Sequence, residues 1–174
     1  QAITASSELE YSVVKVTFNK QAFAISTTLD TPNYSLRRLT KDDKTALQAS
    51  ASDPLIWEML PEKRHEPAVF EPYFKKALEQ KAFAIVDKKT NKIIGTTRFY
   101  DDNVEENSIA IGYTFLTREY WGSGANAEIK SVMLSHAQSQ RETIWFHVAP
   151  DNQRSAKALE KIGATYQKTA DNGS

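Results

Sequence analysis

Cysteine is missing from this sequence of 174 residues. Its absence excludes disulfides, a thiolate nucleophile and cysteine metal sites. There is also no apolar run near about 18 residues and no basic leader with an apolar core, so we expect a cytoplasmic protein without a membrane partner. Basic and acidic residues balance at 22 each, without a basic block, so the sequence carries no electrostatic footprint for nucleic acid.

Metal chemistry is not indicated either. The three histidines, His65, His136 and His147, have no metal-ligand spacing with acidic neighbours, so we expect no metal. The length suits one domain over residues 1–174 that buries roughly two thirds of its unfolded surface. No repeat, linker or low-complexity tract divides it.

A strand, a glycine turn and a helix start follow one another late in the chain. Residues 109–116 are apolar, β-branched and aromatic, and helical periodicity begins at Ala125. Gly122 and Gly124 stand between them. Because the first N–H groups of a helix have no intrahelical partner and the dipole is positive there, this pattern predicts a phosphate cradle. The simpler alternative is a tight turn.

Residues 122–127 also match the dinucleotide fingerprint G-x-G-x-x-A. That alternative is weak because an apparent antiparallel meander precedes the loop and only about 50 residues follow it. The sequence has no G-K-[ST], which removes a Walker-type phosphate loop.

Hydrophobic patterns and turn residues predict the remaining elements. The polar turn 87–91 joins two strands of a meander, the second is interrupted at Gly95, and residues 101–107 read as an acidic loop. Expected strands cover residues 11–18, 34–39, 82–86, 92–100, 108–116 and 143–148. Expected helices cover residues 44–51, a short segment after Asp53, a segment from Pro67 that carries Tyr73 and Phe74, residues 125–140, and a segment from Asn152 to Gly163.

Several short motifs occur together along this order of elements. They are Tyr-Ser-Leu-Arg-Arg-Leu at 34–39, Ile-Gly-Thr-Thr-Arg-Phe at 94–99, Ile-Gly-Tyr-Thr-Phe-Leu at 111–116, Tyr-Trp-Gly-Ser-Gly at 120–124, Asn-Gln-Arg-Ser at 152–155 and Leu-Glu-Lys-Ile-Gly at 159–163. Jointly they resemble the GNAT superfamily of acetyl-CoA-dependent N-acetyltransferases. Within it, they resemble the group that acetylates ribosomal-protein N-termini and related small-molecule amines. The implied fold is α+β, with a central, mostly antiparallel twisted sheet that has a V-shaped splay between two strands and is flanked by helices.

The resemblance implies acetyl-CoA as co-substrate and places its binding residues. Asn152 would contact CoA and Ser155 would reach the departing sulfur, although both also suit the first turn of a helix as capping residues. The exposed backbone of Phe115, Leu116 and Thr117 would pair with the pantetheine arm. The pyrophosphate would lie on Trp121, Gly122, Ser123, Gly124, Ala125 and Asn126. Arg118, Lys130, Arg154 and Lys157 are candidates for the outer phosphates, with a solvated charge as the alternative for each.

The loop and the strand before it depart from the family pattern. Trp121 stands where Gln or Arg is usual, and Asn126 where a small residue is usual. Close relatives commonly carry a catalytic carboxylate at the position of Ala110. Without it, His147 and Glu106 are our candidates for the base, with Glu58, Glu62 and Glu105 as further substitutes, or an amine of low pKa needs no dedicated base.

The resemblance implies direct attack of a primary amine, either a protein N-terminus or a small molecule, on the thioester. The alternative is a CoA-binding regulatory module that has lost catalysis, motivated by Ala110. Relatives continue beyond Gly163 into two further strands, whereas residues 1–30 extend this chain at the other end. We therefore expect an N-terminal strand to add to the sheet, through altered chain order or through exchange between protomers in a homodimer. The simpler alternative is that the C-terminal part is disordered or has been cut from the sequence.

Overall fold

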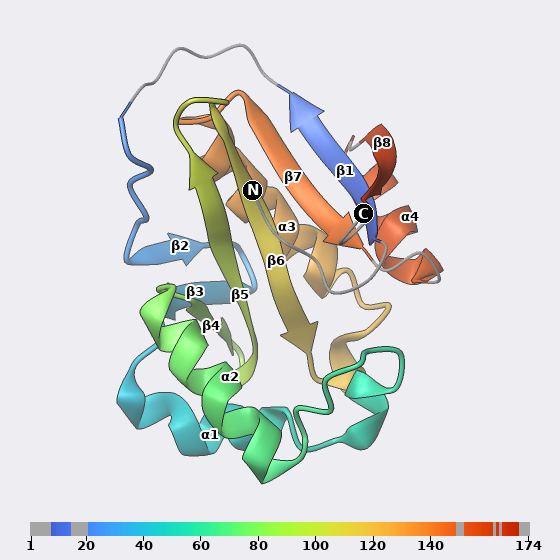
Figure 1. The fold of residues 1–174 in the computed structure, drawn as a ribbon. Helices are drawn as coiled ribbons and strands as arrows, with labels where there is room; N and C mark the ends of the chain where they lie inside the picture. Colours follow the sequence, from blue (N-terminus) through green and yellow to red (C-terminus); the bar gives the residue numbers. More distant parts are fainter. Residues whose placement is uncertain (1–7, 15–20, 149–151, 162, 164, 171–174) are drawn as a thin grey trace. The chain divides into compact units, whose positions relative to one another are not determined.

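A computed structural model describes residues 8–14, 21–148, 152–161, 163 and 165–170 (Figure 1). The chain divides into two compact units. The first, which we call the glycine-loop unit, comprises Ser26–Arg98 and Tyr113–Ile129. The second, which we call the N-terminal-strand unit, comprises Gln1–Ile25, Phe99–Gly112 and Lys130–Ser174. None of the helices in the described ranges is both long and apolar enough to cross a membrane.

The glycine-loop unit is a sheet covered by helices. Its strands lie in the order β2, β3, β4, β5, β6, and the first three pairings are antiparallel. The strands are β2 (Thr28–Asp30), β3 (Tyr34–Arg38), β4 (Phe83–Asp87) and parts of β5 (Lys92–Asn103) and β6 (Ser108–Leu116). The helical elements are η1 (Lys41–Asp43), α1 (Lys44–Ser50), η2 (Pro54–Trp57), α2 (Pro67–Glu79), η3 (Arg118–Tyr120) and the start of α3 (Ala125–Gln138).

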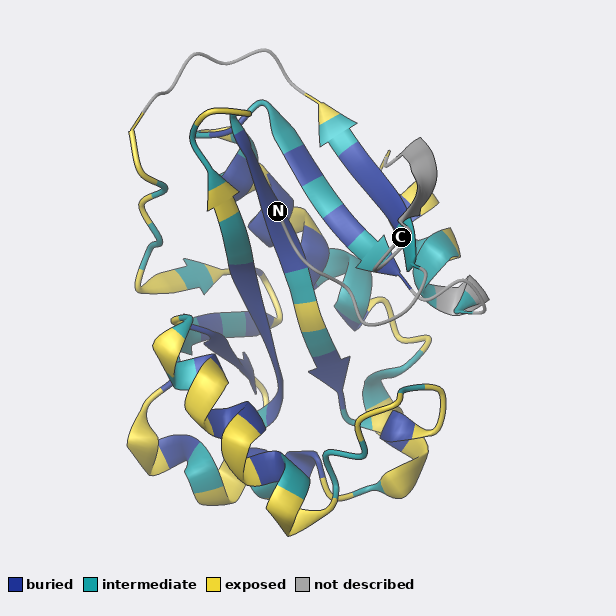
Figure 2. Ribbon diagram, in the orientation of Figure 1, coloured by how far each residue is buried: buried dark blue, intermediate teal, exposed yellow. Residues whose placement is uncertain are grey.

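The core of this unit follows from the apolar stripe of α2 and the continuous burial of β4 (Figure 2). Trp57 is fully buried, and its indole Nε1–H donates to the Ala51 carbonyl at 2.8 Å, which satisfies its one polar atom. The stripe that faces this core consists of Phe70, Tyr73, Phe74 and Ala77.

The N-terminal-strand unit holds the other half of the β5–β6 pair, with strands in the order β5, β6, β7, β1, β8. The pairing of β6 with β7 is parallel, and those of β1 with β7 and β8 are antiparallel. The antiparallel majority and the flanking helices confirm the expected α+β fold class. The elements of this unit are β1 (Glu8–Val14), β7 (Thr143–Val148), α4 (Gln153–Lys161), β8 (Thr165–Ala170) and the remainder of α3.

Several boundaries differ from the sequence expectation. The expected strand 11–18 begins earlier, at Glu8, and its residues 15–18 lie outside the described part of the chain. The sequence analysis missed β2 and β8, which are short or polar and carry little strand signal. The expected loop 101–107 was wrong in its first residues, because β5 continues to Asn103.

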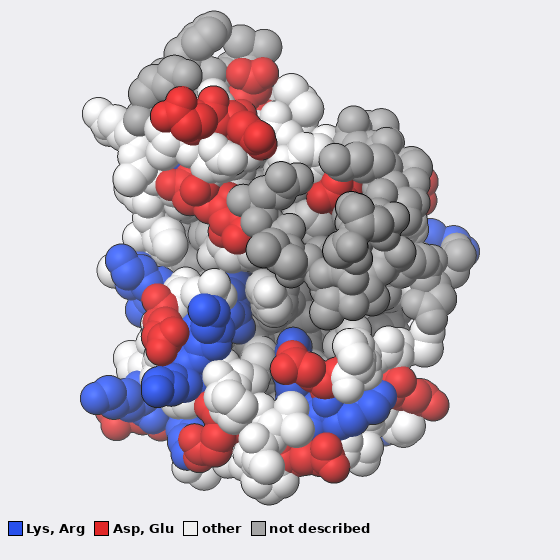
Figure 3. Space-filling view, in the orientation of Figure 1, with Lys and Arg blue, Asp and Glu red and all other residues white. Residues whose placement is uncertain are grey.

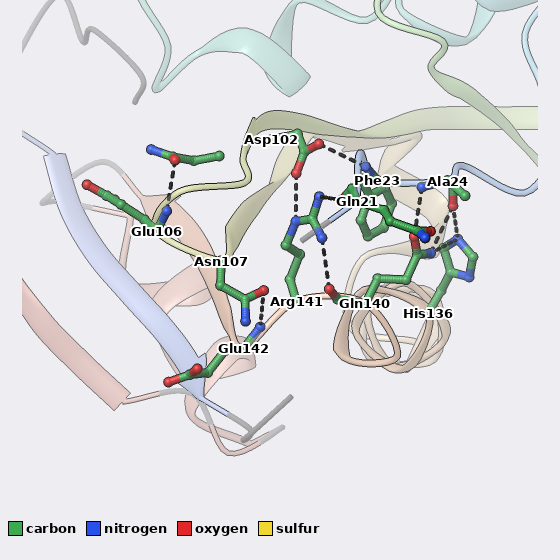
Figure 4. A network of polar contacts seen from close by, with 11 residues as sticks. Gln21, Phe23, Ala24, Asp102, Glu106, Asn107, His136, Gln140, Arg141 and Glu142 are labelled. Carbon is green, nitrogen blue, oxygen red and sulfur yellow. Dashed lines mark hydrogen bonds and ion pairs between the residues drawn. The ribbon is translucent and has the colours of Figure 1, made fainter. Parts of the chain in front are cut away.

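A buried arginine explains that extension. Arg141 is fully buried, and its Nε donates to Asp102 Oδ1 at 2.7 Å, its Nη1 to the Gln140 carbonyl at 2.9 Å and its Nη2 to the Gln21 carbonyl at 2.6 Å (Figure 4). The other oxygen of Asp102 accepts the Phe23 N–H at 2.9 Å. This network satisfies the Asp102 carboxylate within the strand and ties the segment before β2 to the end of α3.

Gly95 marks a close approach of two backbones in the glycine-loop unit. A Cβ at Gly95 would lie 1.9 Å from the Phe115 carbonyl oxygen of β6. The β4–β5 register also shifts beside it, between Ile85 and Val86. The expected interruption at Gly95 is therefore a register shift within a continuous strand.

We predict that Gly95→Ala destabilises the protein by at least about 2 kcal/mol, because the clash is with backbone and can be relieved only by parting two strands. Urea denaturation measures the loss. The matched control is Gly112→Ala, whose Cβ would meet the Tyr100 ring at 3.0 Å, a side chain that can shift. A loss no larger for Gly95→Ala than for Gly112→Ala would contradict this account.

Candidate functional site

The chain between β6 and α3 is shaped by two glycines in the left-handed region. Gly122 has φ of 73° and Gly124 has φ of 90°, and α3 begins directly afterwards at Ala125. A Cβ at either glycine would meet nothing within 4 Å, so the space over this turn is open. The first helical hydrogen bond runs from the Glu128 N–H to the Gly124 carbonyl at 3.1 Å. In the described chain, the N–H groups of Asn126 and Ala127 therefore have no acceptor, which makes the start of α3 an anion-binding end.

Contacts from β4 and β6 hold this turn in place. The Trp121 indole Nε1–H donates to the Leu116 carbonyl at 3.0 Å, and the ring packs against the core around Trp57. The Tyr120 hydroxyl donates to Asp87 Oδ2 at 2.5 Å. Burial, together with the Asp87 carboxylate, raises the pKa of Tyr120 to about 12, so the phenol stays protonated and keeps donating.

The first turn of α3 is anchored separately. The Glu128 carboxylate accepts from Thr31 Oγ1 at 2.5 Å, from the Asn33 N–H at 2.9 Å and from Asn33 Nδ2 at 2.9 Å. Burial works against ionisation, but these hydrogen bonds keep the pKa of Glu128 below its ordinary value. The turn is thus fixed by groups on β4, β6 and the β2–β3 connection before any ligand arrives.

The residues expected to contact the cofactor differ in whether their polar groups already have hydrogen-bond partners. The Phe115 side chain belongs to the core, with its ring centroid 5.0 Å from that of Trp57. The Leu116 carbonyl already accepts a hydrogen bond from the Trp121 indole. The Thr117 N–H donates to the Ile94 carbonyl at 2.9 Å, while its hydroxyl is buried and finds no partner among the described residues. Ser123 is exposed and its hydroxyl donates to the Tyr120 carbonyl at 2.6 Å.

Two of the candidate phosphate cations are already engaged. Arg118 pairs with Asp53, with Nε and Oδ2 2.5 Å apart. Lys130 is 8% exposed, with its ammonium 5.7 Å from the Phe146 ring centroid, so it is neither a solvated charge nor open to a ligand. Figure 3 shows basic and acidic side chains mixed over the lower part of the face that it draws, whereas acidic side chains predominate in its upper part.

In the N-terminal-strand unit, β6 and β7 separate as expected from the splay. They pair from Ser108 with Thr143 to Ala110 with Trp145. Beyond Ala110 no pairing joins these two strands in the described chain, although β6 continues through Gly112 and β7 to Val148. The backbone edges at this point are free to bind an extended ligand.

A chain of three polar side chains lies next to the separation. The Tyr100 hydroxyl is 2.8 Å from His147 Nδ1, and His147 Nε2 is 2.9 Å from Glu10 Oε2. A neutral imidazole protonated at Nε2 satisfies both contacts, because it accepts from Tyr100 and donates to Glu10. The Tyr100 ring also lies over Gly112, which is two residues past the last pair of β6 with β7.

The structure separates the two candidate bases within this unit. Glu106 is exposed in the turn before β6, where its N–H donates to Asn103 Oδ1 at 3.0 Å (Figure 4). That turn is at the paired end of β6 and β7, whereas His147 lies where the strands have parted. Ala110 itself is buried at the last pair.

Asn152 and Ser155 begin α4. Asn152 Oδ1 accepts the Ser155 N–H at 3.2 Å, and the Asn152 carbonyl accepts the Ala156 N–H at 3.2 Å, so Asn152 caps the helix. The Asn152 amide NH₂ and the Ser155 hydroxyl make no hydrogen bond with the residues that the structure describes. The capping role leaves these groups available, and ligand contact by them stays a prediction.

Sequence reasoning missed Glu10 and Tyr100. Glu10 is opposite His147 in the β1–β7 register, and Tyr100 is on the part of β5 beside β6. These residues are far apart in sequence, and no local pattern marks them as partners. Along residues 143–148 buried positions alternate with half-buried ones, which places His147 on the same face of the strand as Thr143 and Trp145.

Comparisons with known proteins show the family of the chain. A family model described as the acetyltransferase (GNAT) domain matches residues 34–165. The chain therefore belongs to the GNAT acetyltransferase family. No curated protein matches the sequence.

Solved structures share the fold. A putative acetyltransferase from T. thermophilus is 25% identical, with a TM-score of 0.70 over 82% of this chain and 77% of its own. A putative ribosomal-protein-serine acetyltransferase from Vibrio cholerae is 14% identical, with a TM-score of 0.65 over 81% of this chain and 84% of its own. A spermidine N-acetyltransferase from Vibrio cholerae, solved with CoA and spermine, is 17% identical, with a TM-score of 0.65 over 79% and 84%. The two Vibrio structures are similar in fold alone.

We predict that Lys130→Met stabilises the protein at pH 7. Burial lowers the pKa of Lys130 to about 8 from an ordinary 10.5, so below pH 8 the folded state carries a desolvated charge. The folded state binds fewer protons than the unfolded state between these values, so this cost fades as pH rises through that window. The gain at pH 7 is on the order of 3 kcal/mol.

Urea denaturation of wild type and variant at pH 7, 9 and 10.5 measures the difference between their free energies of unfolding. The other titrating groups are the same in both proteins, so their contributions cancel in this difference. A difference that does not change with pH would show that Lys130 is not desolvated in the folded state.

Proposed function

We propose that the protein transfers the acetyl group of acetyl-CoA to a primary amine by direct attack, and that it belongs with the enzymes that acetylate ribosomal-protein N-termini and small-molecule amines. Membership of the acetyltransferase family supports the class of reaction. The observation that carries the proposal is the pair of open left-handed glycines in front of the unpaired N–H groups of α3. The proposed location is the cytoplasm.

The turn fits a pyrophosphate. Anionic oxygens are favoured at a helix N-terminus, and Gly122 and Gly124 leave the space over the backbone that such a group needs. In the proposal the N–H groups of Asn126 and Ala127 donate to the phosphate oxygens. The buried Thr117 hydroxyl and the Asn152 amide supply further donors for the rest of CoA.

Acetyl transfer needs a neutral amine whose nitrogen attacks the thioester carbonyl carbon while the carbon–sulfur bond breaks. We assign the proton of the attacking amine to His147, directly or through the Tyr100 hydroxyl, with Glu10 holding Nε2–H so that Nδ1 is the accepting nitrogen. Ser155 would donate a proton toward the departing sulfur. This assignment provides a base although Ala110 has replaced the usual carboxylate, and it favours His147 over Glu106.

Thiol release from acetyl-CoA tests the function, because the protein contains no cysteine to add background. We predict amine-dependent release that Gly124→Glu abolishes, together with a loss of at least about tenfold in CoA affinity, since the new carboxylate enters the anion site.

The matched control is Gly163→Glu. Gly163 has φ of 89° and equally open surroundings, so the same substitution adds the same strain and charge after α4. Equal loss of CoA binding in both variants would count against the cradle. CoA binding without turnover for any amine would favour the regulatory-module alternative.

We predict that His147→Gln lowers kcat by roughly 10²-fold or more without changing the rise in melting temperature that CoA produces. Glu10→Gln, which changes only the group behind the imidazole, should cost less. Glu106→Gln is the comparison: a larger loss in Glu106→Gln than in His147→Gln would reverse the assignment of the base.

A further inference from the structure

Arg98 is a buried charge whose hydrogen bonds are incomplete. It lies on β5 in the glycine-loop unit and is 1% exposed. Its Nη1 donates to Gln80 Oε1 at 2.5 Å, whereas Nε and Nη2 are buried and have no hydrogen-bond partner. Within the described ranges it makes no ion pair. A guanidinium stays charged in proteins, so this side chain holds a positive charge in the interior. The hydrogen bond that it makes is to the neutral side-chain amide of Gln80.

Arg141 is a buried arginine with a structural role, and its hydrogen bonds can be compared with those of Arg98. Its Nε pairs with a carboxylate and both terminal nitrogens donate to backbone carbonyls. Arg98 has no such anion, although its burial is equally complete. The missing partner of Arg98 is therefore an acceptor with negative charge.

A second arginine and a tyrosine stand beside it. The Arg98 guanidinium carbon is 5.7 Å from the Tyr73 ring centroid, and that of Arg64 is 4.5 Å from the same ring. Arg64 donates to the exposed Glu62 through Nη2 at 2.8 Å, but its Nε is buried without a partner. The Tyr73 hydroxyl is also buried and lies in the electrostatic field of both guanidinium groups.

Tyr113 packs its ring against the Arg98 guanidinium and is itself partly exposed. Its ring centroid is 4.5 Å from the guanidinium carbon of Arg98, and the residue is 46% exposed. Its φ of 52° is a left-handed value that a bulky residue adopts rarely, and such strain concentrates at ligand sites. Tyr113 belongs to β6, three residues before Leu116 and the turn that leads to the glycines.

We propose that Arg98, Arg64 and Tyr73 bind a carboxylate on the acceptor, so that the substrate is an amine that also carries an acid group, such as an amino acid. This rests on the proposed function, which it makes more specific. The planar fork of a guanidinium matches a carboxylate, and the Tyr73 hydroxyl adds a second kind of donor. A polyamine is disfavoured, because the guanidinium groups of Arg98 and Arg64 both lie near the Tyr73 ring and repel a cationic substrate, and Glu62, the acid paired with Arg64, is exposed.

The experiment uses pairs of acceptors that differ by the carboxylate alone: lysine with cadaverine, and phenylalanine with phenethylamine. Thiol release from acetyl-CoA gives kcat/KM for each. Wild type should prefer the acid-bearing member by at least tenfold, and Arg98→Met should reduce that ratio to near one, mainly through KM. Arg37→Met is the matched control, because Arg37 is a half-exposed arginine of the same unit that already pairs with Asp43, and it should keep the preference.

A second readout does not depend on turnover. The N-acetyl derivatives of the same amino acids should raise the melting temperature of wild type and of Arg37→Met, but not of Arg98→Met. If the melting temperature rises in this way but no amine is acetylated, the carboxylate site is supported and the proposed acetyl transfer is contradicted. Amine-dependent turnover with equal rates for both members of each pair, unchanged by Arg98→Met, would overturn the carboxylate site and leave the transferase intact. A preference for cadaverine over lysine would overturn it as well.

Discussion

The unpaired N–H groups at the start of α3 are the constraint on which the glycine-loop unit depends. A helix cannot satisfy these donors internally, and among the described residues the fold brings no side chain to Asn126 or Ala127. It instead anchors the turn from outside, through contacts of Trp121 with the end of β6, of Tyr120 with β4 and of Glu128 with the β2–β3 connection. Every one of these contacts holds the turn open rather than closing over it. A site that is rigid before the ligand binds loses less entropy when it does.

The buried charges of Arg141, Lys130 and Arg98 differ in how far their hydrogen bonds are satisfied. Arg141 is satisfied in full and supports the end of β5. Lys130 is buried with an aromatic ring as its neighbour, at a cost in stability. Arg98 is buried and only partly satisfied, next to a strained and exposed Tyr113. Arg98 differs from both Arg141 and Lys130, because further buried donors without a partner, on Arg64 and Tyr73, lie beside it; this grouping is why Arg98 points to a ligand.

The sequence predicted elements whose pattern is local and failed where pairing is distant. Strand β6 was predicted with its correct bounds, because nine residues of apolar and aromatic character end at a clear turn. The glycine turn and the start of α3 were predicted for the same reason. Strand β8 was missed, since its polar residues 165–170 gain their place only by pairing with β1. The site divides in the same way: Gly122 and Gly124 follow from their spacing, whereas Glu10 meets His147 only through the β1–β7 register.

The most direct test of the central claim observes the backbone amides of Asn126 and Ala127 while CoA is added. In ¹⁵N–¹H correlation spectra of the whole protein, these amides should shift and become protected from exchange as the pyrophosphate accepts their hydrogen bonds. The amides at the start of α2, which also opens a helix of this unit, provide an internal comparison and should not change. If CoA binds and leaves Asn126 and Ala127 unchanged, the glycine turn is a structural turn and the account of the site is wrong.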